Sequence, residues 1–342
     1  ARYHGVAMEG YYWRFTDAAR GRVVVALIGV NRDGRGGTWA TVALAAHPGG
    51  HVRSAVVPEA WADPRALGAG ARDGDRTVFA ADARGVRVDL GDDARLDARI
   101  GAPRPWPRRA LGGIGPAQVV PALSQYWHPH LTGGAASGSL RLGDLRWELD
   151  GAQAYGEKNW GDGHGFPPAW WWGQAQGFAR EDACVAFAGG RAGIAGAHVV
   201  ATSLVVVLGD ELIHAVRPLV PMRVHVDGHG FAFRARTPRH SIELEAHADA
   251  TDAHLLPVPV PAERRNLDGA AVQHLAGALR ARVARRGRTV WEGESALAGL
   301  ERGTGPALER ALAGAAAGPG APPGSRPGAS PGAAAPPHAE RR

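Results

Sequence analysis

The sequence predicts a mainly β protein built from two barrel-like or sandwich-like halves, with few helices. Three observations predict this class. Alternating or apolar segments recur at strand length, turn residues such as Gly and Asp-Gly separate them, and long helical patterns are scarce. The recurring segments are Arg22–Val30, Thr38–Ala46, Val86–Leu90, Ser139–Leu142, Val199–Leu208, Ser241–Ala246 and Thr289–Glu294.

The middle of the chain interrupts this rhythm. Residues between Pro103 and Gly134 are irregular and rich in Pro, Gly and aromatics, which predicts a linker or packed connection. Within it, Pro116–Tyr126 is the best helix candidate, although Pro121 would interrupt that helix.

Patterning decides the number of domains, because a chain of 342 residues allows one large domain or two ordinary ones. We expect an N-terminal β domain over residues 1–150 and a C-terminal β domain over residues 151–302. Residues 303–342 are dominated by Ala, Gly and Pro, which predicts a disordered tail.

The formal net charge of +6 does not indicate nucleic-acid binding, because the basic residues are scattered. The densest basic group, between Arg280 and Arg288, alternates with apolar residues and then meets a turn at Gly287. A solvated hairpin face is the favoured interpretation, and contact with an anionic membrane surface is the alternative.

No segment is apolar enough to span a membrane, and the first ten residues do not resemble a secretion signal. We expect a cytoplasmic protein, with peripheral membrane association as an alternative. The chain begins at Ala1, so a removed leader stays open. The single cysteine, Cys184, is expected to be a buried structural residue.

Metal and nucleotide chemistry have little support. His128, His130, His225 and His229 belong to no pattern with a convincing third ligand, so we predict no metal site. The Gly-rich turn Gly34–Gly37 lacks the spacing of a phosphate-binding loop.

The most unusual segment runs from Ala154 to Gln176 and contains Lys158, the only lysine in the chain. A lysine kept where arginine serves everywhere else indicates a compact ammonium with a tunable pKa. A functional role is favoured, and a structural ion pair with Glu157 or Asp162 is the alternative.

Strand alternation separates the polar groups of this segment. If residues 154–160 form a strand, Lys158 and Trp160 face one way, while Glu157 and Asn159 face the other. Glu157 and Lys158 then cannot both point into one pocket. Asp162 and His164 lie in the following turn and are free to do so.

The same alternation puts four later side chains on one face: Trp170, Trp172, Gln174 and Gln176. This gradient from aromatic to amide suits a molecule with an apolar tail and a polar head. Ordinary core packing by tryptophan is the alternative.

An N-terminal strand carries a third candidate cluster, with Glu9, Tyr11, Trp13 and Phe15 on one face. A carboxyl group buried against aromatic rings favours its neutral, proton-donating form. Glu9 is therefore a candidate pocket acid, with an edge carboxylate at the strand mouth as the alternative.

These motifs resemble those of the tocopherol cyclase family. The segment from Tyr155 to Gly161 (YGEKNWG), followed by Phe166-Pro167 and by Trp170, Trp172 and Gln174, is similar to the family's E-K-N-W-G…F-P…W-x-W-x-Q pattern. Residues Glu9–Trp13 (EGYYW) resemble the family's E-G-W-Y-F with two aromatic exchanges, and Asn266–Gly269 fits its closing region.

The resemblance implies two lipocalin-like halves, as in the wider superfamily of AttH-like and carotenoid-hydratase-like proteins. It also implies an isomerase that closes a prenylated hydroquinone to a chromanol-type ring without a cofactor. That reaction needs an acid in a dry pocket and aromatic faces that stabilise a developing tertiary cation.

The resemblance also implies roles for individual residues. The acid is expected among Glu157, Asp162 and Glu9, whereas Lys158 and Asn159 are expected to hold the quinol oxygens or that acid. The substrate is expected to contact Trp160, Trp170, Trp172, Gln174, Tyr11 and Trp13.

Two other functions stay open from the sequence: a carrier that binds a hydrophobic isoprenoid without turnover, and a hydratase of a polyene. The partner is a small hydrophobic molecule in every case, and the sequence leaves the oligomeric state open. A buried acid that converges with Lys158 in one cavity would favour catalysis, whereas an apolar cavity without charges would favour carriage.

Overall fold

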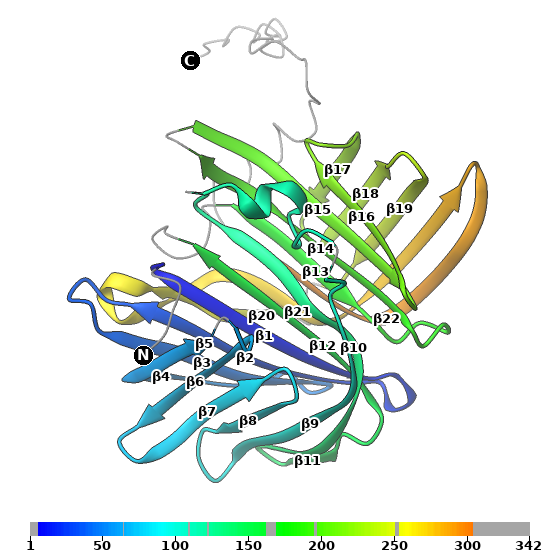
Figure 1. The fold of residues 1–342 in the computed structure, drawn as a ribbon. Helices are drawn as coiled ribbons and strands as arrows, with labels where there is room; N and C mark the ends of the chain where they lie inside the picture. The colour runs from blue at the N-terminus through cyan, green and yellow to red at the C-terminus, as the bar shows by residue number, and fades with distance from the viewer. Residues whose placement is uncertain are drawn as a thin grey trace, which may run out of the picture.

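The computed structural model describes residues 6–63, 65–108, 110–121, 123–161, 169–194, 197–249 and 253–303. These residues form two antiparallel sheets that curl into nearly closed barrels (Figure 1). The predicted fold class is confirmed. The predicted tail lies outside the described residues from position 304 onward.

The first sheet has the strand order β4-β3-β2-β1-β12-β10-β9-β8-β7-β6-β5, and β11 pairs with β10. Short 3-10 helices at Ala18–Arg20 and Gly115–Val119 belong to its connections. The strands are β1 Met8–Asp17, β2 Arg22–Arg32, β3 Thr38–His47, β4 His51–Val57, β5 Glu59–Asp63, β6 Gly68–Asp73, β7 Arg76–Asp82, β8 Gly85–Asp89, β9 Ala94–Pro105, β10 Tyr126–Leu142, β11 Leu145–Glu148 and β12 Ala152–Gly161.

The second sheet has the order β16-β15-β14-β13-β22-β21-β19-β18-β17, and β20 pairs with β21. A 3-10 helix at Pro261–Glu263 separates β20 from β21. The strands are β13 Trp170–Ala175, β14 Ala183–Ile194, β15 Ala197–Leu208, β16 Glu211–Arg217, β17 Met222–Asp227, β18 Gly230–Arg236, β19 His240–His247, β20 Ala253–Val260, β21 Arg265–Arg285 and β22 Arg288–Gly303.

The sheets divide the chain between β12 and β13, so the strand that carries Glu157 and Lys158 belongs to the first sheet. This strand pairs with β1 and with no strand of the second sheet among the described residues. The domain boundary at 150/151 itself remains a prediction.

One correction concerns the connection between β9 and β10. The predicted helix over Pro116–Tyr126 is only a short 3-10 turn at Gly115–Val119. Pro121 cannot continue a helix because it lacks an N–H group, and Tyr126 already begins β10. The irregular segment between β9 and β10 is therefore shorter than expected, and its described residues are 106–108, 110–121 and 123–125.

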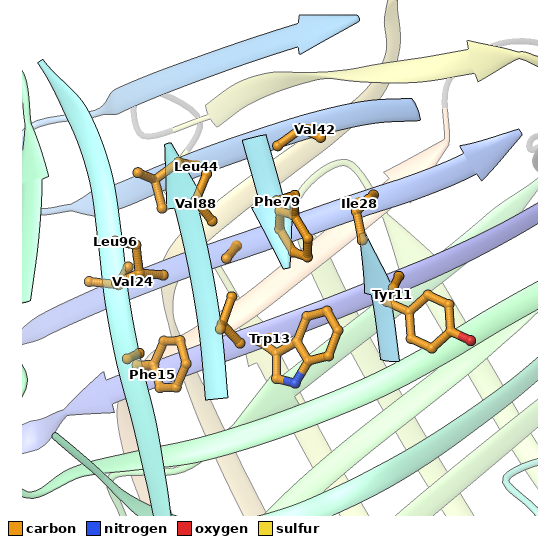
Figure 2. Packing of buried hydrophobic residues seen from close by; sticks show 14 of the residues in the cluster. Tyr11, Trp13, Phe15, Val24, Ile28, Val42, Leu44, Phe79, Val88 and Leu96 are labelled. Atoms are coloured by element: carbon orange, nitrogen blue, oxygen red, sulfur yellow. The ribbon is translucent and has the colours of Figure 1, made fainter. Parts of the chain in front are cut away.

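Each barrel has its own apolar core. Figure 2 shows the first core, where Tyr11, Trp13 and Phe15 from β1 pack against Phe79 and neighbouring aliphatic side chains. The second core contains Trp171, Phe187 and Phe233. Smaller clusters pack between the two sheets.

The burial of individual strands shows where the sheets meet. Strand β9 alternates between buried and exposed residues over most of its length, as expected for a sheet with one solvated face. Strands β1, β2 and β3 are buried on both faces, because their outer faces pack against the second sheet or its loops. This double burial explains the long apolar runs of β2 and β3.

A buried arginine links the two halves. Arg14 projects from β1 and donates through Nη2 to the backbone oxygens of Leu275 (2.8 Å) and Leu297 (2.6 Å). Both oxygens lie where the pairing of β21 with β22 changes register. The guanidinium therefore occupies a break in the second sheet.

We expect Arg14→Met to lower the free energy of unfolding by about 3 kcal/mol, because it leaves buried carbonyl groups without this donor. Urea unfolding monitored by tryptophan fluorescence measures the loss. Arg53→Met is the matched control, since the Arg53 side chain is 53% exposed and its loss should cost no more than about 0.5 kcal/mol. Equal midpoints for both variants would contradict the proposed link.

Candidate functional site

A cavity of about 560 Å³ lies between the two sheets. The first sheet contributes Tyr12, Glu157 and Asn159, and the second contributes Trp170, Trp172 and Glu301. The 3-10 turn Gly115–Val119 and strand β20 complete the wall. Most of the remaining lining is aliphatic or glycine, so the cavity suits a largely apolar molecule.

Glu157 is the central polar group of this cavity and is 5% exposed. Its Oε2 accepts hydrogen bonds from Tyr155 Oη (2.6 Å), Trp127 Nε1 (2.9 Å) and Trp172 Nε1 (2.9 Å). The three donors come from β12, β10 and β13, so the carboxyl group is held at the junction of both sheets.

All hydrogen bonds that Glu157 makes within the described residues end on Oε2, which leaves Oε1 for a proton. Burial raises the pKa of Glu157 to about 7, although the three donors oppose this shift. A carboxylic acid accepts through its carbonyl oxygen and donates through its hydroxyl oxygen. The geometry therefore suits a neutral acid with its proton on Oε1.

Lys158 and Glu9 lie on the opposite face of the first sheet. Lys158 Nζ is 2.7 Å from Glu9 Oε2, and both side chains are almost fully buried. The ammonium also lies over the rings of Tyr11 (4.9 Å) and Trp160 (5.0 Å). Burial lowers the pKa of Lys158, whereas Glu9 opposes that shift.

This arrangement agrees with the alternation expected from the sequence, since Glu157 and Asn159 border the cavity and Lys158 does not. Trp160 shares the face of Lys158 and stacks on Tyr126. The alternative of an ion pair between Lys158 and Glu157 is wrong, since Lys158 pairs with Glu9 instead. Asp162, the other partner considered, lies outside the described residues.

The other predicted contact residues divide between cavity and core. Trp170 and Trp172 border the cavity. Gln174 follows them on the same face but is fully buried beside Cys184. Tyr11 reaches the cavity wall, yet its ring stacks on Trp13 inside the first barrel.

Asp162 and His164 lie outside the described residues, so their predicted proximity to the cavity stays a prediction.

Sequence reasoning missed several cavity groups, above all Glu301. It receives hydrogen bonds from Trp170 Nε1 and Gln273 Nε2, both at 2.8 Å. Sequence reasoning also missed Trp127 and Tyr155 as donors to Glu157. Tyr155 was within the quoted motif, but Glu301 stands in no recognisable pattern.

We expect Lys158→Met to lower the free energy of unfolding by about 3–5 kcal/mol, because it removes the ammonium that lies 2.7 Å from the buried Glu9 carboxylate. Combining it with Glu9→Gln should recover most of this loss, since the neutral amide needs no counter-charge. Urea unfolding of the single and double variants measures both values. A double variant no more stable than Lys158→Met would contradict a simple ion pair.

Among the described residues, no helix is long and apolar enough to cross a bilayer. Groups of three or more His, Cys, Asp or Glu side chains that could hold a metal ion do not occur in that part of the chain either.

Three comparisons relate this chain to known proteins. Kievitone hydratase from Nectria haematococca has a similar structure, with a TM-score of 0.51 and 10% identity over 88% of this chain and 90% of that one. A candidate AttH protein from Nitrosomonas europaea gives a TM-score of 0.49 and 14% identity, covering 89% of this chain and 94% of that one. The tocopherol cyclase-like family model matches residues 107–304, more than half of the chain. The chain therefore belongs to the tocopherol cyclase-like family.

Proposed function

We propose that this protein is an enzyme that adds an O–H group across an isolated double bond of an isoprenoid, with Glu157 as the acid. In the favoured form, the substrate is a prenylated hydroquinone and the product is a chromanol-type ring, an isomerisation. One observation carries the proposal: a buried carboxyl group at the cavity whose pKa is raised to about 7 and whose Oε1 carries no hydrogen bond among the described residues.

The chemical step begins with transfer of the Oε1 proton of Glu157 to the less substituted alkene carbon. The tertiary cation that forms is stabilised by aromatic faces, which Trp172 and Tyr12 supply at the cavity wall. Their rings pack edge to face, with centroids 5.1 Å apart. The phenol oxygen then forms the new C–O bond, and its proton passes to a carboxylate at the cavity wall. This step uses no cofactor.

Asn159 suits the polar head of such a substrate. Its side chain borders the cavity, and Oδ1 is buried without a hydrogen-bond partner among the described residues. This oxygen lies over Gly10, so rotation of the Asn159 amide would be needed to present it to a hydroquinone O–H, which would then orient the ring.

A hydratase is the second candidate, since the same protonation followed by attack of water gives a tertiary alcohol. The kievitone hydratase of similar fold bears the name of such an enzyme, although the likeness extends only to the fold. A carrier without turnover is less favoured. Burying a carboxyl group is costly, and the binding of an apolar ligand does not require one at the cavity.

We expect Glu157→Gln to reduce turnover at least 100-fold while substrate binding changes little. The amide oxygen can still accept from Tyr155, Trp127 and Trp172, whereas the amide nitrogen cannot deliver a proton. Chromatography of an ortho-prenylated hydroquinone after incubation measures turnover. The matched control is Glu294→Gln, whose side chain is 71% exposed. Full activity in Glu157→Gln would remove Glu157 as the acid.

The pH dependence follows from the same group. The acid form of Glu157 prevails below its pKa of about 7. We therefore expect kcat/KM to fall about tenfold per pH unit above that pKa. A pH profile of initial rates measures this decline of kcat/KM. A decline centred near pH 4.5, the ordinary range of a glutamate, would contradict a raised pKa.

A further inference from the structure

A second carboxylate, Glu301, borders the same cavity from β22. Trp170 Nε1 donates to its Oε1 and Gln273 Nε2 donates to its Oε2, each at 2.8 Å. Each oxygen therefore accepts one N–H donor, unlike Glu157, where three donors share one oxygen. Donors on both oxygens favour an ionised carboxylate.

Strand β13 supplies a donor to each of these two carboxyl groups. Trp172 holds Glu157 and Trp170 holds Glu301. The two tryptophans lie two residues apart on one face of the strand, which corresponds to a separation of about 6.6 Å along it. Because both glutamates also line the same cavity, one substrate can meet both carboxyl groups.

The two groups also influence each other electrostatically. Burial raises the pKa of Glu301, and the negative charge of Glu301 contributes to the raised pKa of Glu157. Two negative charges on one cavity disfavour the doubly ionised state, so the pair tends to keep one proton. The hydrogen bonds described above favour Glu157 as its holder.

We propose that Glu301 is the catalytic base of this site and accepts the proton of the attacking hydroxyl group, while Glu157 supplies the proton to the alkene. This inference rests on the proposed function and names the group that removes the proton from the attacking hydroxyl. It extends to either nucleophile, phenol or water.

The step balances without a further reactant. The Glu157 O–H bond breaks and a C–H bond forms, leaving a cation and the Glu157 carboxylate. The hydroxyl oxygen forms the C–O bond, and its O–H proton passes to Glu301. Return of one proton from Glu301 to Glu157, through water that enters after product release, restores the starting state.

Glu301→Gln is a suitable test variant because the site can accommodate the amide. The introduced side chain can still accept from Trp170 through its amide oxygen. The Oε1 atom of Gln273 has no hydrogen-bond partner among the described residues, so rotation of that amide lets it accept from the introduced NH₂ group. The substitution removes the base with little change in packing.

The experiment incubates 2-farnesyl-1,4-hydroquinone in D₂O with the wild type, Glu301→Gln, Glu157→Gln and the exposed-site control Glu294→Gln. Mass spectrometry then measures the product and deuterium in recovered substrate. We expect Glu301→Gln to lose product at least 100-fold. It should still exchange deuterium into the alkene, because a cation that is not captured returns a proton to Glu157. Glu157→Gln should lose both, and Glu294→Gln neither.

Three outcomes oppose these ideas and can be told apart. Product from Glu301→Gln at the wild-type rate overturns the assignment of Glu301 and leaves Glu157 standing. Loss of product together with loss of exchange in Glu301→Gln indicates a structural role in holding Trp170, and also overturns it. Absence of both product and exchange in the wild type overturns the proposed function, and the inference with it.

Discussion

The site depends on one buried carboxyl group that two sheets satisfy together. Glu157 alone in an apolar junction would be costly, and its donors come from β10, β12 and β13. Those contacts require the sheets to pack at one distance and register. The same packing seats the acid at the cavity, and the burial that it imposes raises the pKa of Glu157 against the opposing effect of the three donors.

Neighbouring residues of a strand point to opposite faces of the sheet, so one face can carry the site while the other packs in a core. On β12, Glu157 turns toward the cavity, whereas Lys158 turns into the first half of the molecule and pairs with Glu9. On β13, Trp172 turns toward the cavity and Trp171 toward the second core. Adjacent residues of one motif thus perform different tasks, so a motif as a whole cannot be assigned one role.

The sequence was sufficient for the fold class and for the faces of β1, β12 and β13, because alternation is a local property. It was not sufficient for partners distant in the chain. The pairing of Lys158 with Glu9, and the position of Glu301 beside Trp170, depend on strand order and register. The helix expected over Pro116–Tyr126 was wrong because the chain forms only a 3-10 turn that ends before Pro121, the residue expected to interrupt it.

The protonation state of Glu157 is the most direct test of this account. Infrared difference spectra of the unliganded wild type against Glu157→Gln, recorded from pH 5 to pH 9, isolate its carboxyl band. The account predicts a carboxylic acid C=O band at low pH that gives way to carboxylate with a midpoint of about 7. A carboxylate already formed at pH 5 would contradict a neutral acid at the centre of the cavity.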